Sequence, residues 1–136
     1  MMIFERIATF LDIVAHLAMD PLNLLVLFCS VLMGIIFGAM PGLTSTLGVA
    51  LLTALTYGMD TSLAMVCLLA IYVGGTYGGS YASILINIPG TAAAAATALD
   101  GYPLACRGEG GRAIGLTTTA SAIGTVISML FVVSIS

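Results

Sequence analysis

The residues best able to do chemistry in this sequence are hydroxyl and amide side chains beside two Pro-Gly pairs. The first pair opens the run Pro41-Gly42-Leu43-Thr44-Ser45-Thr46, and the second lies in Asn87-Ile88-Pro89-Gly90-Thr91. Where a helix is interrupted inside a membrane protein, its free N-terminal N–H groups attract anions, and its unwound carbonyl oxygens can bind Na⁺. The two runs therefore predict a site for an anion, with Na⁺ at backbone carbonyls near Gly42 and Gly90.

The same pairs also allow a purely structural interpretation. A proline kink frees backbone groups that neighbouring helices, Ser or Thr side chains or water can satisfy. One isolated pair favours that interpretation. Here there are two pairs, both followed by threonine, and the glycine-rich run Gly74–Ser80 precedes the second. Both interpretations stay open on the residues alone.

No set of residues for catalysis or for holding a metal accompanies these runs. Ser80 and Ser83 have no base near them in sequence, and the run 108–112 lacks the pattern of a phosphate-binding loop. His16 is the only histidine, and it lies on the polar face expected for the N-terminal helix. The three cysteines have no C-x-x-C spacing: Cys29, Cys67 and Cys106. We therefore expect no enzyme, no cofactor and no metal site built from a side-chain cluster.

The composition indicates an integral membrane protein. Of the 136 residues, 60% are hydrophobic and 7% charged, whereas a soluble domain carries about 25% charged residues. A net charge of −3, with three arginines and no lysine, also excludes a nucleic-acid-binding surface. The expected fold is an all-α, multi-span helical bundle in the lipid bilayer.

The elements that must position the hydroxyl residues lie in three runs without charge. A helix over the 39 residues of Pro21–Met59 would be about 58 Å long, whereas the hydrocarbon core is about 30 Å thick. The runs Pro21–Met59 and Thr61–Leu99 must therefore turn back or break. We expect a span at Leu22–Met40, a short apolar piece at Leu43–Gly58, a helix from Thr61 with close packing or unwinding at its glycines, a helical piece at Thr91–Leu99, a wet loop at Asp100–Arg112 and a span at Ala113–Ser136.

The N-terminal segment has a different pattern. Glu5, Thr9, Asp12 and His16 follow one another at helical spacing and form one polar stripe, which suits the membrane interface. Residues 1–20 are thus predicted to be an amphipathic interfacial helix, and residues 21–136 a transmembrane domain that is incomplete at its C-terminus. The pair Asp20-Pro21 is typical of a helix start. Two arginines place the 100–112 loop in the cytoplasm by the positive-inside rule.

Long ordered motifs in this sequence resemble the TctA family, the large membrane subunit of bacterial tripartite tricarboxylate transporters. The resemblance extends from about Leu22 to the end. It rests on Pro41-Gly42-Leu43-Thr44, Tyr72–Ser80, Ile84–Thr91 and Ala96–Ala105. It implies that the chain is the N-terminal portion of an inverted-repeat secondary transporter of the inner membrane, which works with a small membrane subunit and a periplasmic solute-binding protein. The implied substrate is a small carboxylate such as citrate, and the implied driving force is an ion gradient.

The motif positions and the hydroxyl run give the residues that we expect to bind substrate or ion. The family usually has Pro or another residue at position 92 and often Lys at position 106, whereas this chain has Ala92 and Cys106. Neither difference falls on an expected site residue. No acidic, basic or histidine side chain lies in the three charge-free runs, which favours Na⁺ over proton coupling. The expected residues are Pro41, Gly42, Leu43, Thr44, Ser45, Tyr77, Gly78, Gly79, Ser80, Asn87, Pro89, Gly90 and Thr91.

A second function remains open. Gly34, Gly38 and Gly42 recur at four-residue spacing, and small residues at this spacing let helices approach closely. A non-transporting membrane assembly subunit, packed through these glycines, would show the same pattern. It predicts that substitution of Gly34 and Gly38 disrupts assembly, while substitution of Thr44, Ser45 and Thr91 matters little.

Overall fold

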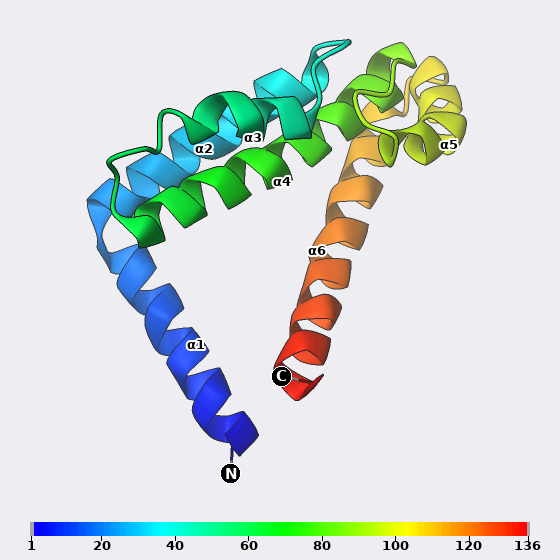
Figure 1. The fold of residues 1–136 in the computed structure, drawn as a ribbon. Coiled ribbons are helices and arrows are strands. Elements are labelled where there is room, and N and C mark those ends of the chain that lie inside the picture. The colour runs from blue at the N-terminus through cyan, green and yellow to red at the C-terminus, as the bar shows by residue number, and fades with distance from the viewer. Residues whose placement is uncertain (1, 136) are drawn as a thin grey trace.

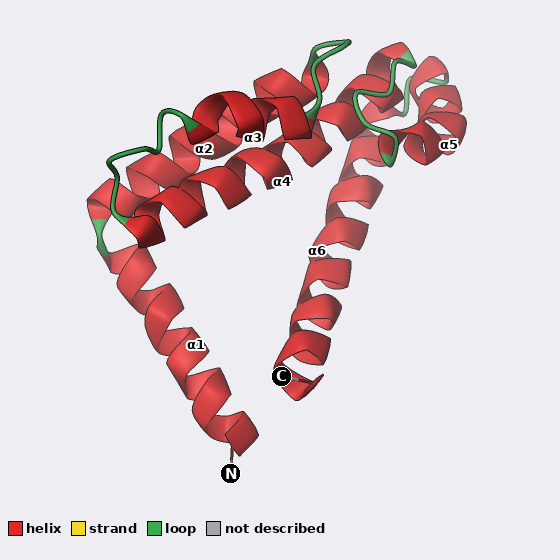
Figure 2. Cartoon of the chain, in the orientation of Figure 1, coloured by secondary structure: helices red, strands yellow, loops and turns green. Residues whose placement is uncertain are grey.

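The chain folds into six helices and, within the described residues, no strand (Figure 2). The structure is a computed structural model that describes residues 2–135, apart from the side chains of residues 2–4, 6, 18 and 133. Three helices are long and apolar enough to cross a membrane: α2, α4 and α6. An all-α membrane protein is thereby confirmed. The helices are α1 (Met2–Met19), α2 (Pro21–Ala39), α3 (Ser45–Thr53), α4 (Thr61–Ile86), α5 (Ala94–Cys106) and α6 (Gly110–Ile135).

Helices α2 and α4 form the centre of the fold and touch backbone to backbone (Figure 1). A Cβ atom on Gly34 would overlap the carbonyl oxygen of Ile71, and one on Gly38 would lie 2.6 Å from the carbonyl carbon of Gly75. Close approach of this kind is what small residues at four-residue spacing permit. The glycine-rich part of α4 thus remains helical, and its glycines serve close packing rather than unwinding.

The two central helices run in parallel. The Ser30 hydroxyl donates to Cys67 Sγ at 3.1 Å, and further along both helices Gly38 meets Gly75. Parallel neighbours need a connection that returns to the starting end. Helix α3 and the turns that follow it provide this return. A Cβ atom on Gly48 would lie 3.5 Å from Ile71 Cγ2, so α3 packs against α4 there. The predicted apolar piece at Leu43–Gly58 is helical only over Ser45–Thr53.

Both central helices begin at an aspartate. The Asp20 carboxylate accepts from Leu22 N at 3.2 Å, with Pro21 at the first helical position. The Asp60 carboxylate accepts from Ser62 N at 3.1 Å. Each carboxylate satisfies a free N–H group and lies at the positive end of the helix dipole. The predicted helix start at Asp20-Pro21 is confirmed.

The expectation of a wet loop at Asp100–Arg112 is wrong. Helix α5 continues to Cys106, with Pro103 inside it, and α6 begins at Gly110. Tertiary packing explains the difference, because Gly101 lies directly under the Ile84 side chain of α4 and burial there favours a continued helix. The chain turns only over 107–109, where Gly108 has a φ of +83° and donates to the Ala105 carbonyl at 2.9 Å.

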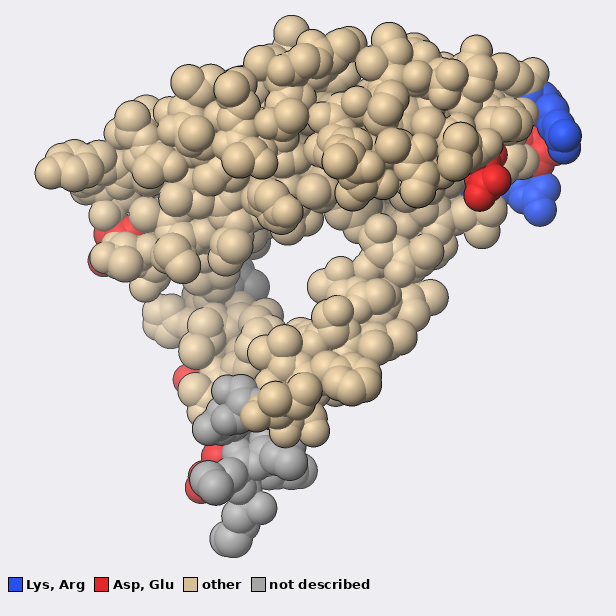
Figure 3. Space-filling model, turned by 45° about the vertical axis from the view of Figure 1, so that its right-hand side comes forward, with Lys and Arg blue, Asp and Glu red and all other residues tan. Residues whose placement is uncertain are grey.

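Helices α1 and α6 extend away from the central pair, and their outer ends approach each other (Figure 1). Most described side chains of both are exposed. In the space-filling view the charged groups lie toward the extremities, and positive charge gathers at one end (Figure 3). The arginines with described side chains, Arg107 and Arg112, belong to the α5–α6 turn, where Arg112 pairs with Glu109 at 2.7 Å. The interfacial position of residues 1–20 and the cytoplasmic side of this turn stay predictions.

Candidate functional site

The first Pro-Gly pair interrupts the apolar run between α2 and α3. Gly42 has a φ of +86°, a conformation that is easy only for glycine. Two residues later, Thr44 is in an extended conformation, and its hydroxyl accepts from Leu47 N at 3.2 Å. Thr44 is therefore the N-cap of α3, and the first N–H groups of this nine-residue helix lie beside its side chain.

The second pair separates α4 from α5. Asn87 adopts a left-handed conformation with a φ of 56° and ends α4, a common role for Asn after a helix. The chain stays irregular to Thr91, whose hydroxyl accepts from Ala94 N at 3.3 Å. Thr91 thus closes the turn that leads into α5, whose own N-cap residue, Ala93, makes no side-chain cap bond.

The tertiary structure brings the two interruptions together. A Cβ atom on Gly90 would overlap the carbonyl oxygen of Gly38 and lie 3.1 Å from Gly79 Cα. A Cβ on Gly79 would in turn lie 3.3 Å from the Thr91 methyl group, while one on Gly75 would lie 2.6 Å from Ser45 Oγ. The glycines of α2 and α4 therefore leave room for both interrupted segments to pack against the same part of these two helices.

A cavity of about 350 Å³ opens where the interruptions meet. Its walls come from the N-terminus of α3, the middle of α4 and the segment that leads into α5. None of the lining side chains is acidic or basic. They are Thr44, Ser45, Thr46, Tyr72, Thr76, Thr91, Ala92 and Ala93.

Ser45 is the unusual residue of this cavity. It is only 3% exposed, and its hydroxyl has no hydrogen-bond partner among the described residues. A buried hydroxyl without a partner is rare in folded proteins, since leaving it unpaired is costly. The Ser45 oxygen is fully enclosed and lies against Gly75 of α4, while the residue itself lines the cavity; rotation of the side chain would turn an unpaired donor toward a ligand that accepts a hydrogen bond.

The electrostatics of the cavity favour an anion. Each helix N-terminus carries about half a positive charge, and the starts of α3 and α5 both lie on the cavity wall. Together they present partial positive charge, along with threonine hydroxyls. This arrangement can bind a carboxylate without an arginine or a lysine.

The structure distributes the predicted site residues over several environments. Three of them line the cavity: Thr44, Ser45 and Thr91. Gly79 and Gly90 pack behind it, and Gly78 contacts α2 at Ile35. Five others lie in the interruptions but do not line the cavity, namely Pro41, Gly42, Leu43, Asn87 and Pro89. Tyr77 and Ser80 line a smaller cavity beside it. A binding role for any of these residues stays a prediction.

Five residues of the wall were not among the predicted site residues, namely Thr46, Tyr72, Thr76, Ala92 and Ala93. Two of them lie far from both interruptions in the sequence. Tyr72 and Thr76 come from the middle of α4 and line the cavity. With Ser80 they form a polar stripe at four-residue spacing on an otherwise apolar helix. That periodicity is the sequence signal for this part of the wall.

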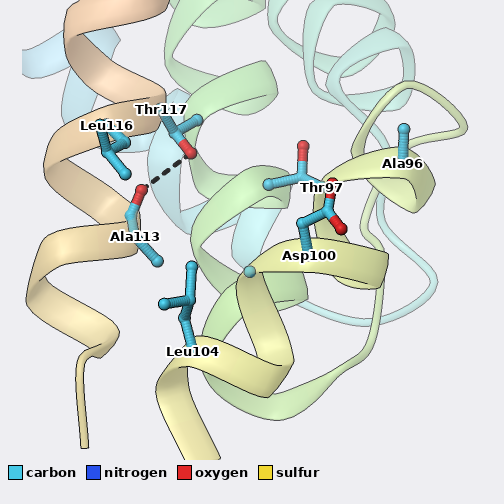
Figure 4. A pocket seen from close by; sticks show the side chains of 8 residues that line it. Ala96, Thr97, Asp100, Leu104, Ala113, Leu116 and Thr117 are labelled. Carbon is cyan, nitrogen blue, oxygen red and sulfur yellow. Dashed lines mark hydrogen bonds between the residues drawn. The ribbon is translucent and has the colours of Figure 1, made fainter. Parts of the chain in front are cut away.

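A second cavity of about 350 Å³ lies between α5 and α6 (Figure 4). Asp100 and Thr97 stand next to each other on α5, while Thr117 on α6 donates to the Ala113 carbonyl at 3.0 Å. Asp100 is exposed, and the described residues contain no group of three metal-ligating side chains. We assign no role to this cavity.

These features define a class: a helical membrane protein with two interrupted segments whose breaks meet at one uncharged, hydroxyl-lined cavity. Comparison with known proteins defines the family. The chain belongs to the tripartite tricarboxylate transporter TctA family, whose model matches residues 24–136. The resemblance drawn from the motifs is thereby confirmed.

One relative in Agrobacterium vitis is described as an uncharacterized 52.8 kDa protein in the TAR-I ttuC' 3' region. It is 36% identical over 118 residues, which are 86% of this chain and 24% of that protein. The chain thus spans about a quarter of the length of this relative. No solved structure matches the chain.

Proposed function

We propose that this chain forms the part of a tricarboxylate-transporter membrane subunit that binds a carboxylate group of the substrate. The observation that carries the proposal is the meeting of the capped start of α3 and the Thr91 turn that leads into α5 at one uncharged, hydroxyl-lined cavity. Interrupted helices whose N-termini face an anionic group are a recurrent solution in secondary transporters.

The position and the size of the cavity support the same function. Tyr72 and Thr76 lie near the middle of the 26-residue helix α4, and a helix of that length crosses a bilayer of about 30 Å. The cavity therefore falls near the midplane, where transporter sites are usually built. Its volume of about 350 Å³ lies within the range of small-molecule pockets, about 300–1,000 Å³.

The remaining parts of the proposal follow from the family. The complete protein is a multi-pass protein of the bacterial inner membrane, and it takes up citrate-like carboxylates delivered by a periplasmic solute-binding protein. A small membrane subunit completes the system. Uptake is driven by an ion gradient, and we propose Na⁺ because the charge-free runs contain no acidic, basic or histidine side chain that could relay a proton.

The direct test is equilibrium binding of citrate to the purified chain in lipid nanodiscs. Thr91→Val removes the cavity hydroxyl in the turn before α5 and keeps the shape of the side chain. We expect about tenfold weaker binding, since hydrogen bonds to charged groups contribute about 1.5–3 kcal/mol. Thr91→Ser should retain most of the affinity.

The matched control is Thr119→Val. Thr119 is exposed on α6, and its hydroxyl bonds only to carbonyls of its own helix, those of Gly115 and Leu116. This variant should bind citrate like the wild type. Equal affinity of Thr91→Val and the wild type, or no citrate binding by the wild type, would overturn the proposed carboxylate site.

A further inference from the structure

The smaller cavity that Tyr77 and Ser80 line shares a wall with the candidate carboxylate site. Its volume is about 70 Å³, against about 350 Å³ for the larger cavity measured in the same way. It is too small for a tricarboxylate. All four lining residues carry a hydroxyl group: Thr76, Tyr77 and Ser80 on α4, and Ser121 on α6. Thr76 also lines the larger cavity.

The Thr76 and Ser80 hydroxyl groups are oriented to accept. Thr76 donates its proton to the Val73 carbonyl at 2.7 Å, and Ser80 donates to the Thr76 carbonyl at 3.1 Å. Because a hydroxyl has one proton and two lone pairs, both oxygens have their protons engaged by the helix backbone and their lone pairs free. Oxygen lone pairs gathered at a small cavity are ligands for a hard cation.

The Tyr77 side chain is also held in place. Its ring packs against that of Tyr81, with centroids 6.2 Å apart and planes tilted by 57°. Helix α6 supplies the opposite wall through Ser121 and packs against α4. The cavity thus depends on two helices that are far apart in the sequence, which makes it a product of the tertiary fold.

A cation in the smaller cavity would balance the negative charge of a carboxylate bound in the larger cavity. No acidic or basic side chain lines either cavity, so a carboxylate would be balanced only by helix N-termini. A monovalent cation across Thr76 would supply a full positive charge at short range in a low-dielectric region, where Coulomb interactions are strong. Binding of either ion would then favour binding of the other.

We propose that Thr76, Tyr77, Ser80 and Ser121 form a binding site for a monovalent cation, Na⁺, beside the carboxylate site. The coupling role of this ion rests on the proposed function, whereas the cation site itself does not. The site differs from one built on backbone carbonyls near Gly42 and Gly90, because it requires side-chain hydroxyls on α4 and α6.

The test is a Na⁺ titration of the chain in nanodiscs, with choline chloride holding the ionic strength constant. The chain has five tyrosines and no tryptophan, so its intrinsic fluorescence reports on tyrosines such as Tyr77. We expect a saturable change with Na⁺ but not with choline. Thr76→Val and Ser121→Ala should each raise the half-saturating Na⁺ concentration about tenfold.

The variants are chosen so that misfolding does not decide the outcome. Thr76→Val keeps the side-chain shape, Thr76→Ser restores a hydroxyl and should restore Na⁺ affinity, and Ser121 is exposed, so its truncation leaves the packing intact. Thr119→Val is the control on α6 and should titrate like the wild type. An unchanged Na⁺ response in both Thr76→Val and Ser121→Ala would overturn the cation site, and so would an equal response to choline or K⁺.

Citrate binding in the same samples separates the two proposals. If citrate binds but Na⁺ gives no saturable response, the cation site fails and the carboxylate site stands. If Na⁺ binds through Thr76 and Ser121 but citrate does not bind, the carboxylate site fails and the cation site stands. When both bind, Na⁺ should tighten citrate binding, and Thr76→Val should reduce that effect.

Discussion

Substitution of Ser45 by alanine should raise stability and lower substrate affinity in the same protein. Ser45 is 3% exposed and its hydroxyl has no partner among the described residues. Burial of an unpaired hydroxyl costs about 1–3 kcal/mol in proteins. Removal of the hydroxyl leaves little empty space, so we expect the free energy of unfolding without ligand to rise by about 1 kcal/mol.

The matched control is Ser30, a buried serine whose hydroxyl, unlike that of Ser45, bonds to a side chain. Ser30 is 5% exposed and donates to Cys67 Sγ at 3.1 Å. Ser30→Ala therefore removes a bond that is made, and should lower stability by about 0.5–1.5 kcal/mol. The same chemical change at two buried serines should thus have opposite signs, with a difference of about 2 kcal/mol.

Two measurements decide the outcome. Unfolding in mixed micelles, followed by circular dichroism, gives the stability of each variant, and citrate titration in nanodiscs gives its affinity. We expect Ser45→Ala to bind citrate about tenfold more weakly, because rotation of the Ser45 side chain would let its unpaired hydroxyl donate to a bound carboxylate. Lower stability in Ser45→Ala would refute the claim that its hydroxyl is unpaired. Higher stability with unchanged citrate affinity would refute its binding role.

Glycine substitutions give the remaining predictions. Gly42 is required for its positive φ, and no atom lies within 4 Å of its Cβ position, whereas Gly90 is required because a Cβ atom there would overlap Gly38. Gly42→Asn should therefore keep citrate binding. Gly90→Asn should lose it. In the complete subunit, Gly42→Leu and Gly90→Leu should both abolish uptake while membrane insertion, measured by fractionation, stays intact; wild-type uptake by both would contradict the site. Gly38→Ala forces α2 and α4 apart by about 1 Å and should destabilise the chain by about 1–3 kcal/mol. Gly124→Ala should not destabilise it, because a Cβ atom on Gly124 meets nothing within 4 Å. Equal stability of the two variants would contradict the close contact of α2 and α4.

Several features could be predicted from the sequence because their causes are local. The composition required a membrane environment, since nine charged residues cannot cover a soluble globule. The Pro-Gly pairs required interruptions, because proline lacks an N–H group and Gly42 takes a positive φ. Asp20-Pro21 marked a helix start in the same local way. None of these inferences needed knowledge of a distant neighbour.

The error at Asp100–Arg112 shows where local reasoning fails. Glycine, proline and charge in that stretch are loop signals, yet the helix continues because Gly101 packs against Ile84 of α4. The contact lies 17 positions away in the sequence, and no local signal at Gly101 marks it. Intrinsic preference is a weak determinant that tertiary packing overrides.

The cavities were decided by tertiary structure alone. The sequence supplied hydroxyl residues at both interruptions, but whether they meet depends on the parallel contact of α2 and α4 and on the return of the chain through α3. Thr76 joined the two cavities only because α3, α5 and α6 all pack around the same helix. A residue's spacing along the chain fixes its face on its own helix, whereas the partner of that face depends on contacts between segments far apart in the sequence.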